Sequence, residues 1–285
     1  MARIVFSDID GTLLTDDKRV TEKTEQAVKG LVQQGIPFVL VSARMPEAIY
    51  PITEAMGVKI PLISYSGALV LTEEGETLYS LTMKAEHAAA FLEAVEAHFP
   101  QATVNYYAGH HWYVKDTSDP RVALEMKITG AVAERRSFAD CLAEGTLPHK
   151  ILLMMEPADC ERAERELQAL FPALNVVRSA PHLLEIMDAS VNKASGIEVM
   201  LKHFGLEASD ALSFVSAARI SIRATMLVSA RMIRCSQRLP ARSLSSAKAA
   251  ITVRSVFTRL KRLCNERYLR IPPGRRRYCY IAAYC

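Results

Sequence analysis

Continuous apolar runs alternate with amphipathic segments along the first 82 residues of the chain. Two of the amphipathic segments have helical spacing and end at a glycine, and the first begins after Thr21, a residue type that commonly caps helices. Because apolar strands separated by helices are typical of parallel sheets covered on both faces, the pattern predicts an α/β fold. The predicted strands are residues 4–6, 37–41 and 62–64, and the predicted helices are residues 21–35 and 46–56.

Residues 83–187 follow a different pattern. Two aromatic-rich segments on either side of Gly109 predict a hairpin, and the other predicted strands also favour antiparallel pairing. The α/β alternation resumes near Val191, with a helix over 194–204 and a strand over 211–214. We therefore expect an inserted α+β domain at 83–187 and a Rossmann-like parallel sheet core made of residues 1–82 and 188–214. Inside the insert the predicted helices are residues 84–98 and 158–171, and the predicted strands are residues 104–107, 112–115, 150–155, 175–178 and 183–187.

Residues 215–285 form an anomalous basic tail in which the alternation of strands and helices ends. From residue 211 onward the chain has 16 basic side chains and one acidic side chain, Glu266, whereas residues 1–210 have 19 basic and 30 acidic ones. The tail is rich in Arg, Ser, Ala and Cys, as expected for a shifted frame of a GC-rich gene, so we predict a frame shift near codon 215. Such a charge would suit nucleic acid, but Arg residues scattered without a common face make this partner the weaker interpretation.

The composition of the whole chain is that of a globular protein, with 50% hydrophobic and 23% charged residues. No apolar run reaches the ~18–20 residues that span a bilayer, and Asp8 and Asp10 interrupt what would be the apolar region of a secretory signal. We therefore expect a cytoplasmic protein without a membrane partner. The six cysteines include no CxxC pair, which disfavours a zinc site, and nothing in the sequence indicates an oligomeric state.

Two carboxylates, Asp8 and Asp10, follow directly after the first predicted strand. In open α/β sheets ligands bind at the carboxyl ends of the strands, and side chains two residues apart in an extended segment point the same way. Together these carboxylates could hold a hard cation, and one could attack an electrophile while the other transfers protons. Gly11 lets the chain turn and expose backbone N–H groups to an anion.

The segment FSDIDGTLL (residues 6–14) resembles the first motif of Cof-type (subfamily IIB) phosphatases of the haloacid dehalogenase superfamily. The resemblance continues at Ser42, which ends PFVLVS, and at Lys193 in DASVNKASG, and it covers residues 1–214. It implies that residues 83–187 are a cap domain, which closes over the site and selects the substrate. The turn SYSGA departs from the family's pattern because Ser66 stands where Asn is usual.

The resemblance also implies a role for each matched residue. Asp8 would be the nucleophile and Asp10 the general acid and base, with Mg²⁺ on the Asp8 carboxylate and the Asp10 backbone carbonyl. Further candidates for substrate contacts are Arg44 and Gly67. The phosphate-binding groups would be the Ser42 hydroxyl, the Lys193 ammonium and the backbone N–H groups near Ile9 and Ala43.

The family's fourth motif, GDxxND, is missing after the last predicted strand. Residues 215–221 read VSAARIS, and no Asp follows Asp210, which precedes that strand and so lies at its wrong end for metal binding. The sequence therefore predicts a Mg²⁺-dependent phosphatase that hydrolyses small phosphomonoesters such as sugar phosphates through an aspartyl-phosphate, with activity weakened by this loss. The alternative is a catalytically dead binder of phosphate ligands. A mutase is disfavoured by the VNKASG motif and by the layout of the insert.

Overall fold

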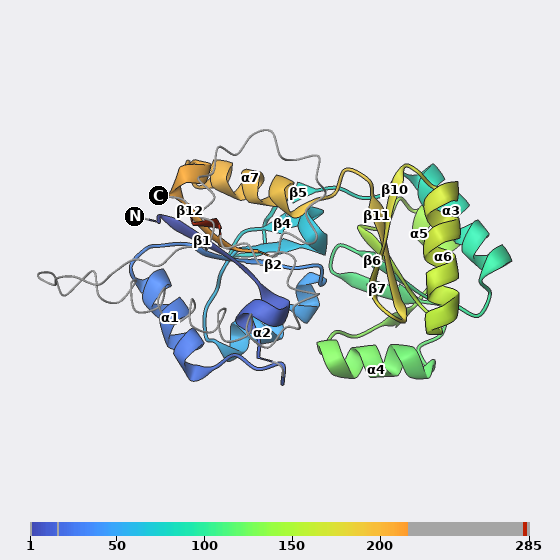
Figure 1. The fold of residues 1–285 in the computed structure, drawn as a ribbon, viewed down its shortest axis with the longest axis horizontal. Helices are drawn as coiled ribbons and strands as arrows, with labels where there is room; N and C mark the ends of the chain where they lie inside the picture. The colour runs from blue at the N-terminus through green and yellow to red at the C-terminus, as the bar shows by residue number, and fades with distance from the viewer. Residues whose placement is uncertain (1, 16, 216–281, 284–285) are drawn as a thin grey trace, which may run out of the picture.

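The computed structural model describes residues 2–15, 17–215 and 282–283, and they contain two sheets, one in each half of the molecule (Figure 1). The first sheet has seven strands in the order β13-β12-β1-β2-β3-β4-β5, and the second has six in the order β10-β11-β9-β6-β7-β8. The strands of the first sheet are β1 (Ile4–Asp8), β2 (Phe38–Val41), β3 (Leu62–Ser64), β4 (Leu69–Leu71), β5 (Thr77–Ser80), β12 (Ala211–Phe214) and β13 (Ala282–Ala283).

The centre of the first sheet is parallel. Strands β12, β1, β2 and β3 pair in that order and run in one direction, which confirms the Rossmann-like core predicted from the apolar runs. Strands β4 and β5 extend this sheet in antiparallel fashion and were not predicted. The predicted basic tail lies outside the described residues, apart from Val215 and the strand β13.

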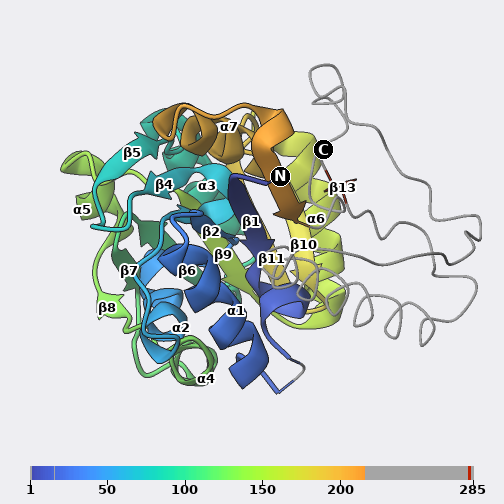
Figure 2. The same ribbon diagram turned by 90° about the vertical axis from the view of Figure 1, so that its left-hand side faces the viewer.

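Helices cover both faces of the core sheet (Figure 2). Alternate side chains of β1 point to opposite faces: Val5 packs on the side of α1 and α2, while Ile4 and Phe6 pack on the side of α7. Thr21 is the N-cap of α1, as predicted, because its hydroxyl accepts a hydrogen bond from Thr24 N at 3.2 Å. These helices are α1 (Glu22–Gln33), α2 (Tyr50–Ala55) and α7 (Lys193–His203), and a short turn η4 (Ala208–Asp210) precedes β12.

The helix predicted over residues 46–56 is interrupted. A short 3₁₀ turn, η2 (Pro46–Ala48), comes first, and α2 begins at Tyr50. Pro51 has no N–H to donate to the preceding turn, so a continuous α-helix through this point would lose a backbone hydrogen bond.

The second sheet belongs to the insert, and helices α3, α5 and α6 cover its outer face (Figure 1). Its strands pair antiparallel except for β7 with β8, and the hairpin predicted around Gly109 is β6–β7. The sequence did not predict α4, α5 or β8. The strands are β6 (Thr103–Ala108), β7 (His111–Val114), β8 (Glu134–Arg135), β9 (Lys150–Met154), β10 (Leu174–Ala180) and β11 (Leu183–Asp188). The helices are α3 (Ala85–His98), α4 (Pro120–Thr129), α5 (Phe138–Ala143) and α6 (Pro157–Leu170).

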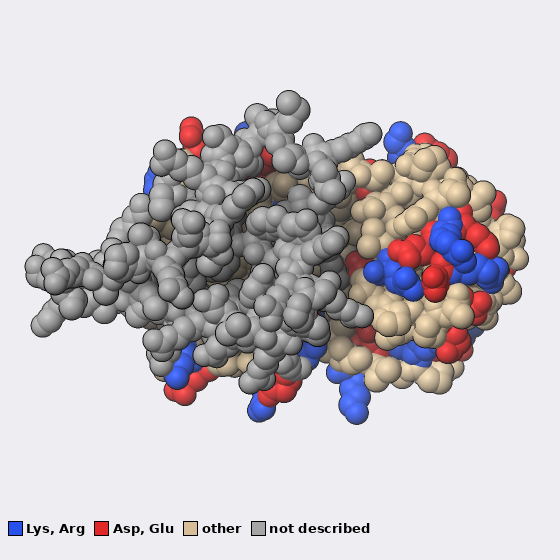
Figure 3. Space-filling model, in the orientation of Figure 1, with Lys and Arg blue, Asp and Glu red and all other residues tan. Residues whose placement is uncertain are grey.

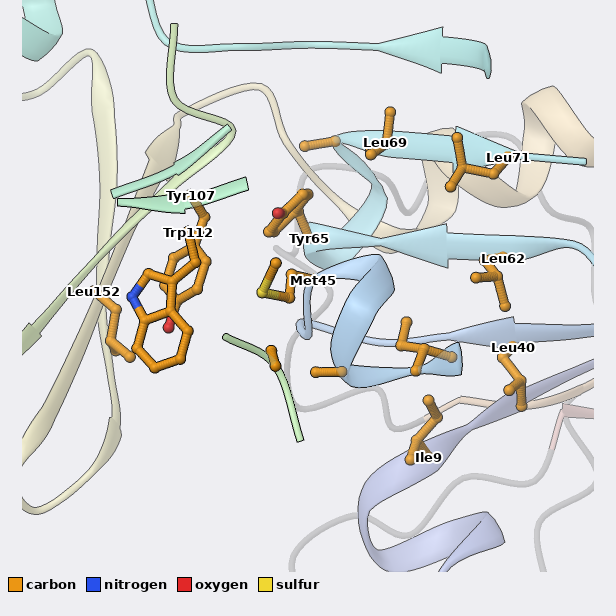
Figure 4. Close-up of a cluster of buried hydrophobic side chains, with 14 of the residues drawn as sticks. Ile9, Leu40, Met45, Leu62, Tyr65, Leu69, Leu71, Tyr107, Trp112 and Leu152 are labelled. Carbon is orange, nitrogen blue, oxygen red and sulfur yellow. The ribbon is translucent and has the colours of Figure 1, made fainter. Parts of the chain in front are cut away.

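One apolar cluster continues from the core into the insert (Figure 4). Leu40 and Met45 lie on the core side of it, Tyr107 and Trp112 lie on the insert side, and Tyr65 lies between them. Burial of this shared apolar surface favours association of the two units, because each large side chain removed from water stabilises by roughly 1.5–3 kcal/mol.

The surface of the insert carries charges of both signs side by side (Figure 3). On the face that Figure 3 shows, these charges do not form the single-sign patch typical of nucleic-acid binding. Among the described residues, no helix is both long enough and apolar enough to cross a bilayer.

Candidate active site

Two neighbouring parallel strands bring the predicted site residues to one rim of the core sheet. Asp8 is the last residue of β1 and stands in register with Val41 of β2, so Ser42 follows directly beside it. Lys193 is the first residue of α7 and reaches the same rim from the face of the sheet that α7 covers, opposite to α1 and α2. The carboxyl ends of the strands therefore gather groups that are up to 185 positions apart in the chain.

The Asp8 carboxylate is held from two sides. Its Oδ1 accepts a hydrogen bond from Ile9 N at 2.9 Å, and its Oδ2 lies 2.6 Å from the Lys193 ammonium. The Lys193 side chain is 1% exposed and that of Asp8 is 13% exposed. Since a buried charge without a partner is strongly destabilising, each of these two groups depends on the other.

The Asp10 carboxylate faces two cations. Arg44 donates to both of its oxygens, from Nε at 2.9 Å and from Nη2 at 2.8 Å, and Lys18 Nζ lies 3.0 Å from Oδ1. Burial raises the pKa of Asp10, but the hydrogen bonds and charges of Arg44 and Lys18 outweigh it and lower the pKa from 3.8 to about 2. The sequence suggested Arg44 as a substrate contact and gave no signal for Lys18, which reaches Asp10 only through the path of the loop after η1 (Ile9–Leu13).

The Ser42 side chain is buried at the end of β2 and is 1% exposed. Its hydroxyl oxygen accepts a hydrogen bond from Arg44 N at 3.2 Å, so the hydroxyl hydrogen can still be donated to an anion. Ile9 and Ala43, whose backbone N–H groups were predicted to bind phosphate, flank this hydroxyl and the Asp8 carboxylate. This arrangement suits a group with several negatively charged oxygens.

Gly67 lies in the turn η3 (Tyr65–Gly67) and supports the segment that carries Lys193. Its φ is +108°, and a Cβ atom at this position would lie 2.1 Å from Asn192 O. Asn192 in turn caps α7, because its Oδ1 accepts a hydrogen bond from Ser195 N at 2.9 Å. Gly67 therefore lets two backbones approach closely, and its predicted contact with substrate stays a prediction. Ser66, where the family pattern has Asn, is buried with a positive φ of 56°.

The insert, which the resemblance predicts to be a cap domain and which we call the cap, also contributes a buried cation at this rim. Lys150, the first residue of β9, donates to Ala43 O at 2.8 Å, and its ammonium lies 5.0 Å from the centre of the Tyr107 ring. Burial raises the pKa of Glu125 in α4, and the nearby charges of Lys150 and Arg44 partly oppose that rise. Sequence reasoning missed Lys150, because a lysine that opens a strand carries no signal for a contact 107 residues away.

Two further contacts join the cap to the core. The Tyr65 hydroxyl donates to Gly109 O at 2.8 Å, and the His149 ring stacks on Tyr65 with a centroid distance of 5.2 Å. His149 Nδ1 accepts a hydrogen bond from Gly109 N at 3.0 Å. Burial, with a smaller effect from the charge of His110, lowers the pKa of His149 from 6.5 to about 4.

The site offers oxygen ligands for one loosely held divalent ion. Mg²⁺ takes one or two carboxylates and completes its shell with water and substrate oxygens, so Asp8 with the carbonyl of Asp10 fits that chemistry. Within the described residues, no group of three or more His, Cys, Asp or Glu side chains could hold a metal. Asp210 cannot complete the set, because its carbonyl pairs with Arg3 N, roughly 16 Å along β1 from Asp8. Residues 216–221, where the fourth motif was sought, lie outside the described residues.

Comparisons with known proteins agree with this geometry. Residues 5–214 match the family model described as haloacid dehalogenase-like hydrolase. A Haemophilus influenzae protein named "Putative phosphatase" is 31% identical over 214 residues, which cover 75% of this chain and 80% of that protein.

Solved structures share the fold. A haloacid dehalogenase-like hydrolase from Bacteroides thetaiotaomicron aligns with a TM-score of 0.68 and 23% identity over 76% of this chain and 82% of the other. A sugar phosphatase of subclass IIB in the same superfamily aligns with a TM-score of 0.62 and 19% identity over 74% of this chain and 80% of the other.

Proposed function

The chain belongs to the haloacid dehalogenase-like hydrolase family, as predicted, and on that premise we propose that it hydrolyses small phosphomonoesters, such as sugar phosphates, through an aspartyl-phosphate. The observation that supports this most directly is the 2.6 Å contact between Asp8 and Lys193 beside Ser42. A carboxylate, a buried cation and a hydroxyl donor then stand at one rim of the sheet, where they could act together on a phosphoryl group.

In the proposed reaction Asp8 attacks the phosphorus atom in line with the ester oxygen. The bond from phosphorus to the Asp8 oxygen forms while the bond to the leaving oxygen breaks, and Asp10 gives that oxygen a proton. Because Arg44 and Lys18 hold the pKa of Asp10 at about 2, Asp10 carries this proton only when the bound phosphoryl group competes for those two cations. Water then attacks the phosphorus atom, Asp10 takes a proton from this water, and the bond to Asp8 breaks to release phosphate. Ser42, Lys193 and the backbone N–H groups near Ile9 and Ala43 would bind the phosphoryl oxygens, and Ile9 N itself would first have to release Asp8 Oδ1.

A Mg²⁺ ion held by Asp8 and the Asp10 carbonyl would supply charge neutralisation between the carboxylate and the phosphoryl group. We propose that this ion is held weakly, because the chain has no Asp after Asp210 and only Glu266 as a later carboxylate. Turnover is therefore expected to be slow. If the nucleotide sequence around codon 215 encodes GDxxND in a neighbouring frame, the missing ligands are explained.

The test is turnover of p-nitrophenyl phosphate with Mg²⁺ by the full chain and by Asp8→Asn. We expect slow hydrolysis that falls about a thousandfold or more in Asp8→Asn, because removal of a nucleophile abolishes the covalent route. Asp17→Asn, an exposed carboxylate in the loop after η1, is the matched control and should leave the rate unchanged. Equal rates in the parent and in Asp8→Asn would reject Asp8 as the nucleophile.

The second candidate is a protein that binds phosphate ligands without turning them over, and the missing fourth motif favours it. Binding of a sugar phosphate without detectable hydrolysis would separate it from the enzyme. Under either function the partner is a small phosphomonoester, and the cytoplasmic location stays a prediction from the sequence.

A further inference from the structure

The number of cations at the site exceeds the number of carboxylates. Among the residues that the structure describes, Asp8 and Asp10 are contacted by Lys193, Arg44 and Lys18. Three positive charges face two negative ones, and the nearby Lys150 and Glu125 offset each other, so this rim has an excess of positive charge before any metal ion binds. An incoming phosphate dianion is therefore attracted by the side chains themselves.

The three cations also retain donors for a ligand. A guanidinium has five N–H groups in a planar fork, and Arg44 directs its Nε and one Nη2 hydrogen to Asp10. Each lysine contacts one carboxylate oxygen, and an ammonium has three hydrogens. Planar forks of this kind bind phosphoryl oxygens in pairs, so Arg44 can bridge Asp10 and a phosphate.

We infer that this site captures the phosphoryl group of a monoester without a divalent metal ion, through Lys193, Arg44 and Lys18, and that the metal ion serves turnover only. The inference rests on the phosphoryl site proposed above and adds that binding and turnover differ in their need for metal. It distinguishes this chain from a site in which a bound ion must first neutralise the carboxylates. Arg44 contributes more to phosphate binding than Lys18, because its side chain is 18% exposed whereas that of Lys18 is 60% exposed and therefore more strongly screened by solvent.

The test is calorimetric titration of the full chain with inorganic phosphate, once in EDTA and once with Mg²⁺. We expect the two dissociation constants to agree within about threefold, because the protein cations supply the charge. In EDTA, Arg44→Met should weaken binding about tenfold or more, since it removes charge-assisted hydrogen bonds. Lys18→Met should weaken it less, because an exposed cation is screened by solvent.

Arg19→Met is the matched control, because Arg19 lies beside Lys18 and pairs with the exposed Asp17 instead of Asp10. It should bind phosphate as the parent does. Binding that requires Mg²⁺, or an Arg44→Met variant that binds phosphate normally in EDTA, would overturn the inference. The two failures are distinguishable: binding in EDTA with no turnover in Mg²⁺ rejects the phosphatase and keeps metal-free capture, whereas turnover with metal-dependent binding keeps the phosphatase and rejects metal-free capture.

Discussion

The core and the cap each place one buried lysine at their common boundary, and the two lysines have different partners. Lys193 of the core is 1% exposed and meets the Asp8 carboxylate, whereas Lys150 of the cap is 7% exposed and meets the Ala43 carbonyl and the Tyr107 ring. An ammonium paired with a carboxylate can also attract the oxygens of a phosphoryl group that binds beside that carboxylate. An ammonium bonded to a backbone carbonyl holds two domains together. Under the proposed function, the same residue type would serve catalysis in the core and attachment of the two units in the cap.

Replacing each lysine in turn tests this difference most strongly. Lys193→Met should lower kcat/KM for p-nitrophenyl phosphate about a hundredfold to a thousandfold, as expected for loss of one group that stabilises the transferring phosphoryl oxygens. Lys150→Met should lower it less than about tenfold and instead reduce the free energy of unfolding by about 1–3 kcal/mol, because Ala43 O loses a charged donor. Steady-state rates and urea titrations measure both effects. If the two variants lose turnover equally, the division of roles between the lysines is wrong.

Two glycines, one in the core and one in the cap, allow the cost of an added side chain to be compared between the two regions. Gly67→Ala in the core turn should reduce the free energy of unfolding by about 3 kcal/mol, because the new Cβ would lie 2.1 Å from Asn192 O. Gly109→Ala at the tip of the cap hairpin also has a positive φ, of 58°, but no atom lies within 4 Å of its Cβ position. It should cost only about 1 kcal/mol, the strain of the left-handed conformation alone. Similar urea midpoints for the two variants would contradict the close approach of Gly67 to Asn192.

Acidification tests the buried histidine that links the cap to the core. Because the folded-state pKa of His149 is lowered from 6.5 to about 4, the unfolded chain binds the proton first as the pH falls. Stability from this neutral ring is present above pH 6.5 and is lost as the pH falls towards 4, by about 2 kcal/mol between pH 7 and pH 5. His149→Gln should remove that part of the pH dependence in urea titrations, whereas His98→Gln, an exposed residue of α3, should keep it. An unchanged pH dependence in His149→Gln would show that other groups cause it.

The weakest predicted effect concerns the contact between the cap hairpin and η2, where His110 Nδ1 lies 2.6 Å from Glu47 Oε1. The hydrogen bond with Glu47 raises the pKa of His110, so this pair stabilises below pH 6.5 and the effect is lost as the pH rises through the raised pKa. Glu47→Gln should cost about 0.5 kcal/mol near pH 6, since the His110 side chain is 44% exposed and solvent screens the pair. At about pH 9 the variant and the parent should unfold at the same urea concentration. The exposed Glu74→Gln is the control, and a larger effect at high pH than at low pH would reverse the sign predicted here.

Local patterns were sufficient for much of the fold. The parallel strands around β1, the helix that follows Thr21 and the β6–β7 hairpin were predicted because each depends on spacing within about fifteen residues. Most of the missed elements are short, but α4 has ten residues and was missed as well. Strands β4 and β5 are no shorter than the predicted β2 and β3, so length alone does not explain why they were missed. Pro51 divides a segment whose spacing suggested one helix.

The sequence by itself determined which polar groups stand at this rim of the core sheet, because Asp8 and Asp10 follow an apolar run and Ser42 and Lys193 occupy recognisable motifs. Only the tertiary structure decided which charges these groups meet. The contacts of Arg44 and Lys18 with Asp10, of Lys150 with Ala43, and of Gly67 with the segment that carries Lys193 all depend on how distant segments pack. Such contacts leave no local periodicity, since a cation reaches its partner through the fold and not through its neighbours in sequence.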